Sequence, residues 1–219
     1  MDNAPLPSKR SAMQALLSRV AVCALGFVLL ASQVIAAEVS VHVLDDQSAP
    51  VADAAVYWLP LSGRAPRGSL QGTIEQADKT FMPYVSVVQT GTAVSFPNRD
   101  TVRHHVYSFS APKVFDLKLY TGTPAQPVVF DKPGLVALGC NIHDWMLAYV
   151  LVVDSPWFDV SAANGRAVVR NLPVGDYRMV VWHPRMKEEI MQQVKITGAT
   201  QSVRIKISLS KPELRRQGA

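Results

Sequence analysis

Three side chains that can bind a metal lie close together in the second half of the chain. Cys140, His143 and Met146 are spaced three residues apart. A thiolate, an imidazole and a thioether form a soft donor set, which suits copper cycling between Cu(I) and Cu(II), with a weakly bound methionine helping to set the potential. Such a site also needs a second imidazole. The loop therefore predicts a further ligand from another part of the chain.

A second imidazole is available about 35 residues earlier. His104 and His105 stand side by side where a strand is expected to begin. Successive side chains of a strand point to opposite faces, so His104 would share a face with the apolar Val106. This placement favours His104 as the ligand, and His105 is its rival.

Two other chemistries fit the loop less well. Zinc prefers four strong nitrogen, sulfur or oxygen donors, and the thioether of Met146 is a poor one. A nucleophile built from Cys140, His143 and Asp144 would crowd into one short loop, where a general base is hard to aim at the sulfur. Each residue alone could also be structural, but their combination favours copper. The chain lacks the common haem, zinc-protease, serine-hydrolase and phosphate-loop motifs.

The N-terminus predicts export. Basic residues precede an apolar run over 20–31, and Ala36 and Ala37 follow it. This layout predicts a signal peptide over 1–37 and a periplasmic protein, with an uncleaved signal anchor as the alternative. Cys23 would leave with the peptide, so Cys140 would have no internal disulfide partner in an oxidising compartment. Its thiol must then be buried, paired between molecules, or bound to a metal.

The rest of the chain predicts an all-β protein. Short apolar runs alternate with polar residues and are separated by glycine, proline, asparagine and aspartate. Near the C-terminus, 190–196 and 202–209 are expected to form a hairpin, followed by a flexible tail over 210–219. The net charge of +5 identifies no partner, and no concentrated basic stretch indicates nucleic-acid binding. No segment after the signal peptide is long and apolar enough to span a membrane.

Several residues near the predicted ligands have two interpretations. Asn98, Asn141 and Asp144 could orient the loop and the imidazoles, or they could simply form turns. Trp145 could shield the site or line a partner surface, or it could pack in the core.

Residues 70–154 resemble the cupredoxins, the plastocyanin and amicyanin family. The resemblance rests on segments 138–146 and 96–107, and the spacing of His143 and Met146 is most like amicyanin. It implies a Greek-key β-sandwich that binds one copper ion through His104, Cys140, His143 and Met146. The family's usual Pro-His-Asn is replaced around His104 by Arg103 and His105. The loss of that asparagine removes one hydrogen bond that ties the two ligand segments together in the family.

The flanking segments resemble a second family. Segments 43–56 and 164–177 are similar to carboxypeptidase regulatory-like, transthyretin-like β-sandwiches. This implies a small β-sandwich made from 38–62 and 157–209, with the cupredoxin domain over 70–154 inserted in it or joined to it. The linkers would be 63–72 and 155–156. One extended sandwich with long excursions is the alternative.

The cupredoxin resemblance implies a function. We expect a non-catalytic, one-electron carrier that exchanges electrons with a redox protein donor and acceptor. The alternative is a copper-binding or copper-delivery module without electron-transfer turnover.

Overall fold

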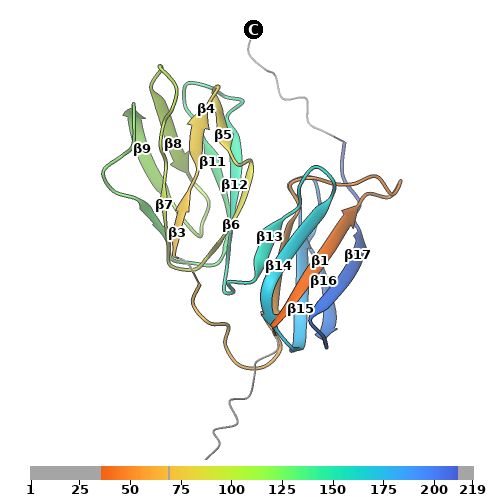
Figure 1. The fold of residues 1–219 in the computed structure, drawn as a ribbon. Helices are drawn as coiled ribbons and strands as arrows, with labels where there is room; N and C mark the ends of the chain where they lie inside the picture. Colours follow the sequence, from red (N-terminus) through yellow and green to blue (C-terminus); the bar gives the residue numbers. More distant parts are fainter. Residues whose placement is uncertain (1–35, 69, 212–219) are drawn as a thin grey trace, which may run out of the picture. The chain divides into compact units, whose positions relative to one another are not determined.

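The chain is all-β throughout the part that the structure describes. A computed structural model describes residues 36–68 and 70–211, and this part folds into strands joined by turns and loops, with no helix (Figure 1). None of these residues therefore belongs to a helix that could cross a membrane. The all-β prediction is confirmed.

Strands from both ends of the chain form two sheets. They are β1 (Ala36–Leu44), β2 (Ala55–Pro60), β13 (Phe158–Val160), β14 (Arg166–Pro173), β15 (Gly175–Trp182), β16 (Ile190–Ile196) and β17 (Thr200–Lys206). One sheet has the order β14-β1-β17 and the other β13-β2-β15-β16. Val39, Val41 and Val43 of β1 are buried in one core with Trp58 and Met179. The alternation predicted for this segment therefore supplies an apolar face.

The middle of the chain forms a separate set of sheets. Its strands are β3 (Gln71–Thr73), β4 (Glu75–Ala77), β5 (Thr80–Met82), β6 (Val85–Gln89), β7 (Thr92–Ser95), β8 (His104–Ser108), β9 (Phe115–Tyr120), β10 (Val128–Phe130), β11 (Gly134–Gly139) and β12 (Leu147–Val153). The sheet orders are β10-β7-β3 and β6-β12-β11-β8-β9, and β4 pairs with β5. Cys140 and Met146 lie in the core of this region, with Phe96, Phe130 and Val106. The predicted metal loop is thus anchored in packed apolar side chains.

The domain boundaries stay a prediction. Strands β3–β12 pair only with one another, as do the remaining strands. A third apolar cluster nevertheless joins Tyr57 and Val180 to Val87 and Leu151. The described residues, 36–68 and 70–211, all belong to one compact unit.

The predicted terminal segments lie largely outside the described residues. Of the proposed signal peptide over 1–37, only Ala36 and Ala37 are described, and they begin β1, where Ala37 pairs with Leu172. Of the tail over 210–219, the described part includes Ser210, whose N–H donates to the carbonyl of Arg185.

The predicted C-terminal hairpin is wrong. β16 pairs with β15, whereas β17 pairs with β1 in parallel in the other sheet. This pairing places Val203 and Ile205 beside Val41 and Val43. Pairing with β1 extends its apolar face, and this outweighs a local turn near Gly198. The prediction failed because alternation along a strand specifies which face is buried but not which strand pairs with it.

A buried histidine after β15 makes stability depend on pH. His183 is 6% exposed, and its Nδ1 accepts the backbone N–H of Arg185 at 3.0 Å. Burial, helped by the charge of Arg185, lowers the pKa of His183 from 6.5 to about 4. The unfolded chain therefore binds a proton between these values that the folded chain does not.

We expect the free energy of unfolding to fall as the pH drops from 6.5 towards about 4, and to be unaffected by this group above that range. His183→Asn keeps an acceptor for the Arg185 N–H and should flatten this part of the profile. Urea unfolding measured across the pH range tests this. Equal slopes for the two proteins would contradict it.

Candidate metal centre

The loop that carries three of the predicted ligands connects two paired strands. β11 and β12 are antiparallel, and Gly139 lies opposite Leu147, so residues 140–146 form the connection. The N–H of Met146 donates to the carbonyl of His143 at 2.9 Å. Cys140 and Met146 are buried, whereas His143 is half-buried. The loop is thus held at both ends by the sheet and across its middle by a turn.

The upstream imidazole comes from the first residue of β8. His104 and Val106 face the core and are both 0% exposed. His105 pairs instead with Asp116, through its Nε2 and a carboxylate oxygen. Of the two candidate histidines, the structure therefore places His104 against the loop.

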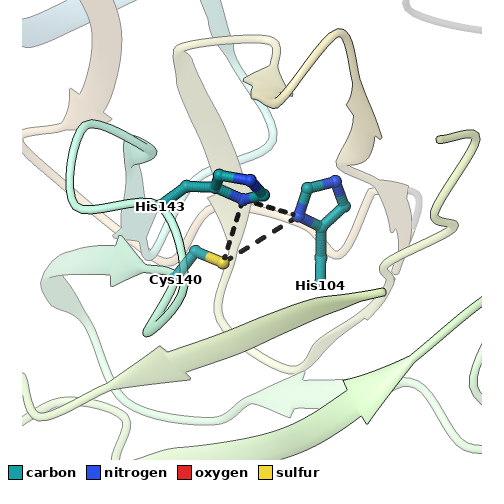
Figure 2. A group of neighbouring side chains, drawn as sticks. All are labelled: His104, Cys140 and His143. Carbon is teal, nitrogen blue, oxygen red and sulfur yellow. Dashed lines mark hydrogen bonds between the residues drawn. The ribbon is translucent and has the colours of Figure 1, made fainter. Parts of the chain in front are cut away.

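Three donor atoms converge on one point (Figure 2). The Sγ of Cys140 is 3.9 Å from the Nδ1 of His104 and 3.9 Å from the Nδ1 of His143. The two nitrogens are 3.2 Å apart. Lone pairs on the nitrogens and a thiolate at these separations repel one another unless a proton or metal ion lies between them. The cluster is therefore suited to hold a cation.

The size of this triangle matches a metal ion. A triangle with sides of 3.2, 3.9 and 3.9 Å contains a point about 2.1 Å from all three corners. Zinc, which like copper is a first-row metal, forms bonds of roughly 2.0–2.3 Å to histidine nitrogen and cysteine sulfur. The three side chains therefore fit a first-row metal without rearrangement. Two imidazoles and a thiolate in a trigonal arrangement form the donor set of blue-copper sites.

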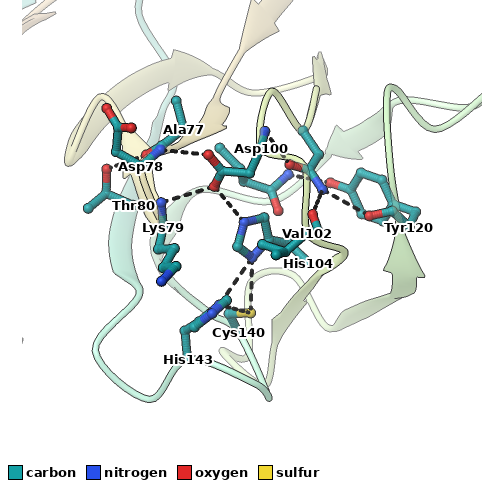
Figure 3. A network of polar contacts seen from close by, with 12 residues as sticks. Ala77, Asp78, Lys79, Thr80, Asp100, Val102, His104, Tyr120, Cys140 and His143 are labelled. Carbon is teal, nitrogen blue, oxygen red and sulfur yellow. Dashed lines mark hydrogen bonds and ion pairs between the residues drawn. The ribbon is translucent and has the colours of Figure 1, made fainter. Parts of the chain in front are cut away.

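The proton on His104 is placed by a carboxylate. The Nε2 of His104 is 2.7 Å from Oδ2 of Asp100 (Figure 3). An ionised carboxylate only accepts hydrogen bonds, so the neutral ring carries its proton on Nε2. The Nδ1 of His104 then has a free lone pair facing Cys140 and His143. This is the tautomer that a metal ion requires.

The electrostatics of the site favour an ionised Asp100 and a neutral His143. Burial raises the pKa of Asp100, but hydrogen bonds from the N–H of Lys79, from His104 and from the N–H of Asp78 outweigh it, and the net shift is downward. Burial, helped by the electrostatic interaction with His104 and by the positive charge of Lys79, lowers the pKa of His143 below 6.5, against the opposing charge of Asp100. At neutral pH the carboxylate is therefore ionised and the His143 ring is neutral.

Of the three residues predicted to orient the site, only Asn98 makes hydrogen bonds that do so. Asn98 orders the segment before His104, because its amide donates to the carbonyls of Val102 and Tyr120, both at 2.9 Å. Asn141 and Asp144 are exposed, and their side chains make no hydrogen bond to the three clustered ligands.

Trp145 was predicted to shield the site, line a partner surface or pack in the core, and Met146 was predicted to be a ligand. The ring of Trp145 contacts that of His143 at a centroid distance of 5.0 Å and also packs against the apolar core. Met146 is buried in the same core as Cys140. Its ligation stays a prediction.

Sequence reasoning missed Asp100. It lies four residues before His104 in a segment without helical or strand periodicity, so nothing local indicates that its carboxylate reaches the imidazole. Its role follows only from the folded arrangement.

Gly139, next to Cys140, is closely packed against an aromatic side chain. It lies opposite Tyr107 of β8, and a Cβ atom at Gly139 would be 2.7 Å from the end of the Tyr107 ring. The phenol therefore covers the backbone beside the thiol. A side chain at this position would have to displace the ring.

The comparisons with known proteins find similar structures only. No family model matches the chain, and no curated protein matches it. A purple cupredoxin from Nitrosopumilus maritimus is 22% identical, covering 37% of this chain and 98% of its own, with a TM-score of 0.33. A copper-containing nitrite reductase from Thermus scotoductus is 24% identical, covering 51% of this chain and 28% of its own, with a TM-score of 0.36. A Cu(I) amicyanin variant is 17% identical. The match covers 44% of this chain and 97% of the amicyanin chain, with a TM-score of 0.34.

We expect Gly139→Ala to push the Tyr107 ring outward and to lower the free energy of unfolding by about 1 kcal/mol, the low end for overpacking, since the phenol end can swing away. In a Tyr107→Val background the same change should be neutral or stabilising, because alanine suits a strand better than glycine. A double-mutant cycle by urea unfolding measures the coupling. Equal costs in both backgrounds would contradict the contact.

Proposed function

We propose that this chain is a periplasmic type 1 copper protein that carries single electrons. The observation that supports the proposal most directly is the triangle formed by the donor atoms of His104, Cys140 and His143. One copper ion bound there would supply a one-electron couple between Cu(I) and Cu(II). The soft thiolate and the neutral imidazoles would accommodate both oxidation states.

The ligand side chains are held in place by contacts within the protein itself. Cys140 lies at the end of β11 in the core, and His104 lies in a strand with its ring held by Asp100. Such preorganisation keeps the positions of the ligands nearly constant when the charge of the site changes. Little reorganisation then accompanies each transfer, as an electron carrier requires. Met146, buried in the same core, would be the fourth and more weakly bound ligand.

The half-buried ligand marks a route for electrons. His143 is more exposed than His104 and uses Nδ1 towards the cluster, so the opposite edge of its ring is turned away from it. Trp145 packs against that ring. We propose that redox partners, a donor and an acceptor protein, exchange electrons through this ring. Export by the predicted signal peptide would deliver the protein to the periplasm.

A copper-delivery module is the second candidate function. It would need a site that releases its ion readily to a receiving protein. The deep burial of His104 and Cys140 favours retention, and therefore favours the electron carrier.

We expect the purified protein to turn intensely blue with Cu(II), through charge transfer from the thiolate, and to show a reversible one-electron wave. Cys140→Ser should abolish the colour, and His104→Ala should abolish or strongly alter it. His105→Ala is the matched control and should leave it unchanged, because His105 pairs with Asp116 outside the cluster. Visible absorption and voltammetry make the measurements.

A colourless copper complex would contradict the proposal of an electron carrier. The same holds if the protein retains zinc as tightly as copper and shows no reversible redox wave. Rapid loss of copper to a chelator would favour delivery instead.

A further inference from the structure

The carboxylate that contacts His104 is itself held by a turn far away in the sequence. Oδ1 of Asp100 accepts the N–H of Asp78 at 2.8 Å, and Oδ2 accepts the N–H of Lys79 at 2.9 Å (Figure 3). The same Oδ2 is 2.7 Å from Nε2 of His104. The side chain of Asp100 is 16% exposed. Three donors thus converge on one largely buried carboxylate.

The turn has a shape that presents its two N–H groups together. Asp78 and Lys79 connect β4 to β5 as a two-residue turn, with φ values of 51° and 55°. Two consecutive residues with positive φ form a tight hairpin turn that matches the twist of the strands. The adjacent N–H groups then offer a small binding place for an anion, which the carboxylate of Asp100 fills.

The turn and the carboxylate are also joined through the backbone. The N–H of Gln76 donates to the carbonyl of Pro97 at 2.9 Å, and the N–H of Arg99 donates to the carbonyl of Gln76 at 2.8 Å. The N–H of Asp100 donates to Oδ1 of Asn98 at 2.9 Å. The position of Asp100 is therefore fixed independently of its contact with the imidazole.

We propose that Asp100 is a positioning residue through which the β4–β5 turn acts on the metal centre. The turn orients the carboxylate, the carboxylate holds the proton of His104 on Nε2, and Nδ1 is left bare towards Cys140 and His143. The proposal deepens the proposed function, since it concerns the same site, but the placement of the proton can be tested without any metal.

The second histidine of the pair provides an internal comparison. His105 also contacts a carboxylate, that of Asp116, but its ring is outside the donor triangle, and the side chain of Asp116 is 52% exposed. Contact with a carboxylate is therefore not enough to make a histidine a candidate metal ligand. Asp100 differs in that its orientation is set by the turn and its partner is 0% exposed.

The test uses the metal-free, full-length protein labelled with nitrogen-15 in histidine. Two-bond proton–nitrogen correlation spectra report the tautomer of each ring, and hydrogen exchange reports the protection of the Nε2 proton. We expect wild-type His104 to carry a protected proton on Nε2. In Asp100→Asn the amide has one acceptor oxygen for three donors, so His104 should show faster exchange and a mixture of tautomers.

Two variants are matched controls. Asp116→Asn removes the corresponding carboxylate from His105 and should leave His104 unchanged. Lys79→Arg keeps both the backbone N–H that binds Asp100 and the positive charge near His143, so it should also leave the tautomer of His104 unchanged. Binding of Cu(II) and Co(II) should weaken roughly 10- to 100-fold in Asp100→Asn, as for other residues that orient metal ligands, and remain at the wild-type level in both controls.

Two results would overturn the proposal. One is a wild-type His104 with its proton on Nδ1, a result that needs no variant to fold. The other is a folded Asp100→Asn whose His104 tautomer, proton exchange and metal affinity match the wild type, which would make the carboxylate purely structural. A wild-type protein that binds no copper but keeps the protected Nε2 proton would contradict the proposed function while supporting the positioning role.

Discussion

The structure depends on holding three electron-pair donors in a small space that is largely closed to solvent. Two imidazole nitrogens and a sulfur atom lie 3.2–3.9 Å apart, with His104 and Cys140 buried. In water each donor would be hydrated separately, so their convergence is unfavourable until a cation is bound. The folded chain must supply the energy that keeps them together. The packing and hydrogen bonds around the site are the sources of that energy.

Strand pairing and core packing provide most of this constraint. The hairpin of β11 and β12 fixes both ends of the ligand loop, and β8 pairs with β9 to place His104 at a strand end. Cys140 shares its core with Phe96 and Phe130, so movement of the sulfur would disturb packed side chains. Asn98 and Asp100 then fix the orientation of the imidazole segment through hydrogen bonds. A rigid apolar scaffold and a few directional polar contacts thus divide the task between them.

The sequence indicated the part of this arrangement that is local. Cys140, His143 and Met146 lie in one loop, and their spacing, combined with an upstream histidine and an unpaired cysteine, pointed to a metal. The alternation of β8, together with the spacing of His104 from Asn98, favoured His104 over His105, because neighbouring residues of a strand face opposite ways. The all-β class likewise followed from period-2 patterning along the chain.

The remainder depends on contacts between distant segments. Nothing near Asp100 indicates that the turn at Asp78 and Lys79 will bind its carboxylate. The partner of β17 could not be deduced for the same reason, since alternation identifies a buried face and leaves the neighbouring strand open. Close packing of Tyr107 over Gly139 is also a property of strand register and is invisible in either segment alone. Local pattern therefore predicted the residues that cluster, and only the fold shows what positions them.

X-ray absorption at the copper edge of the Cu(II)-loaded protein tests the central claim most directly. The geometry predicts a first shell with one short copper–sulfur bond and two copper–nitrogen bonds from imidazole, supplied by Cys140, His104 and His143. A first shell of nitrogen and oxygen alone, with no short sulfur contribution, would contradict it.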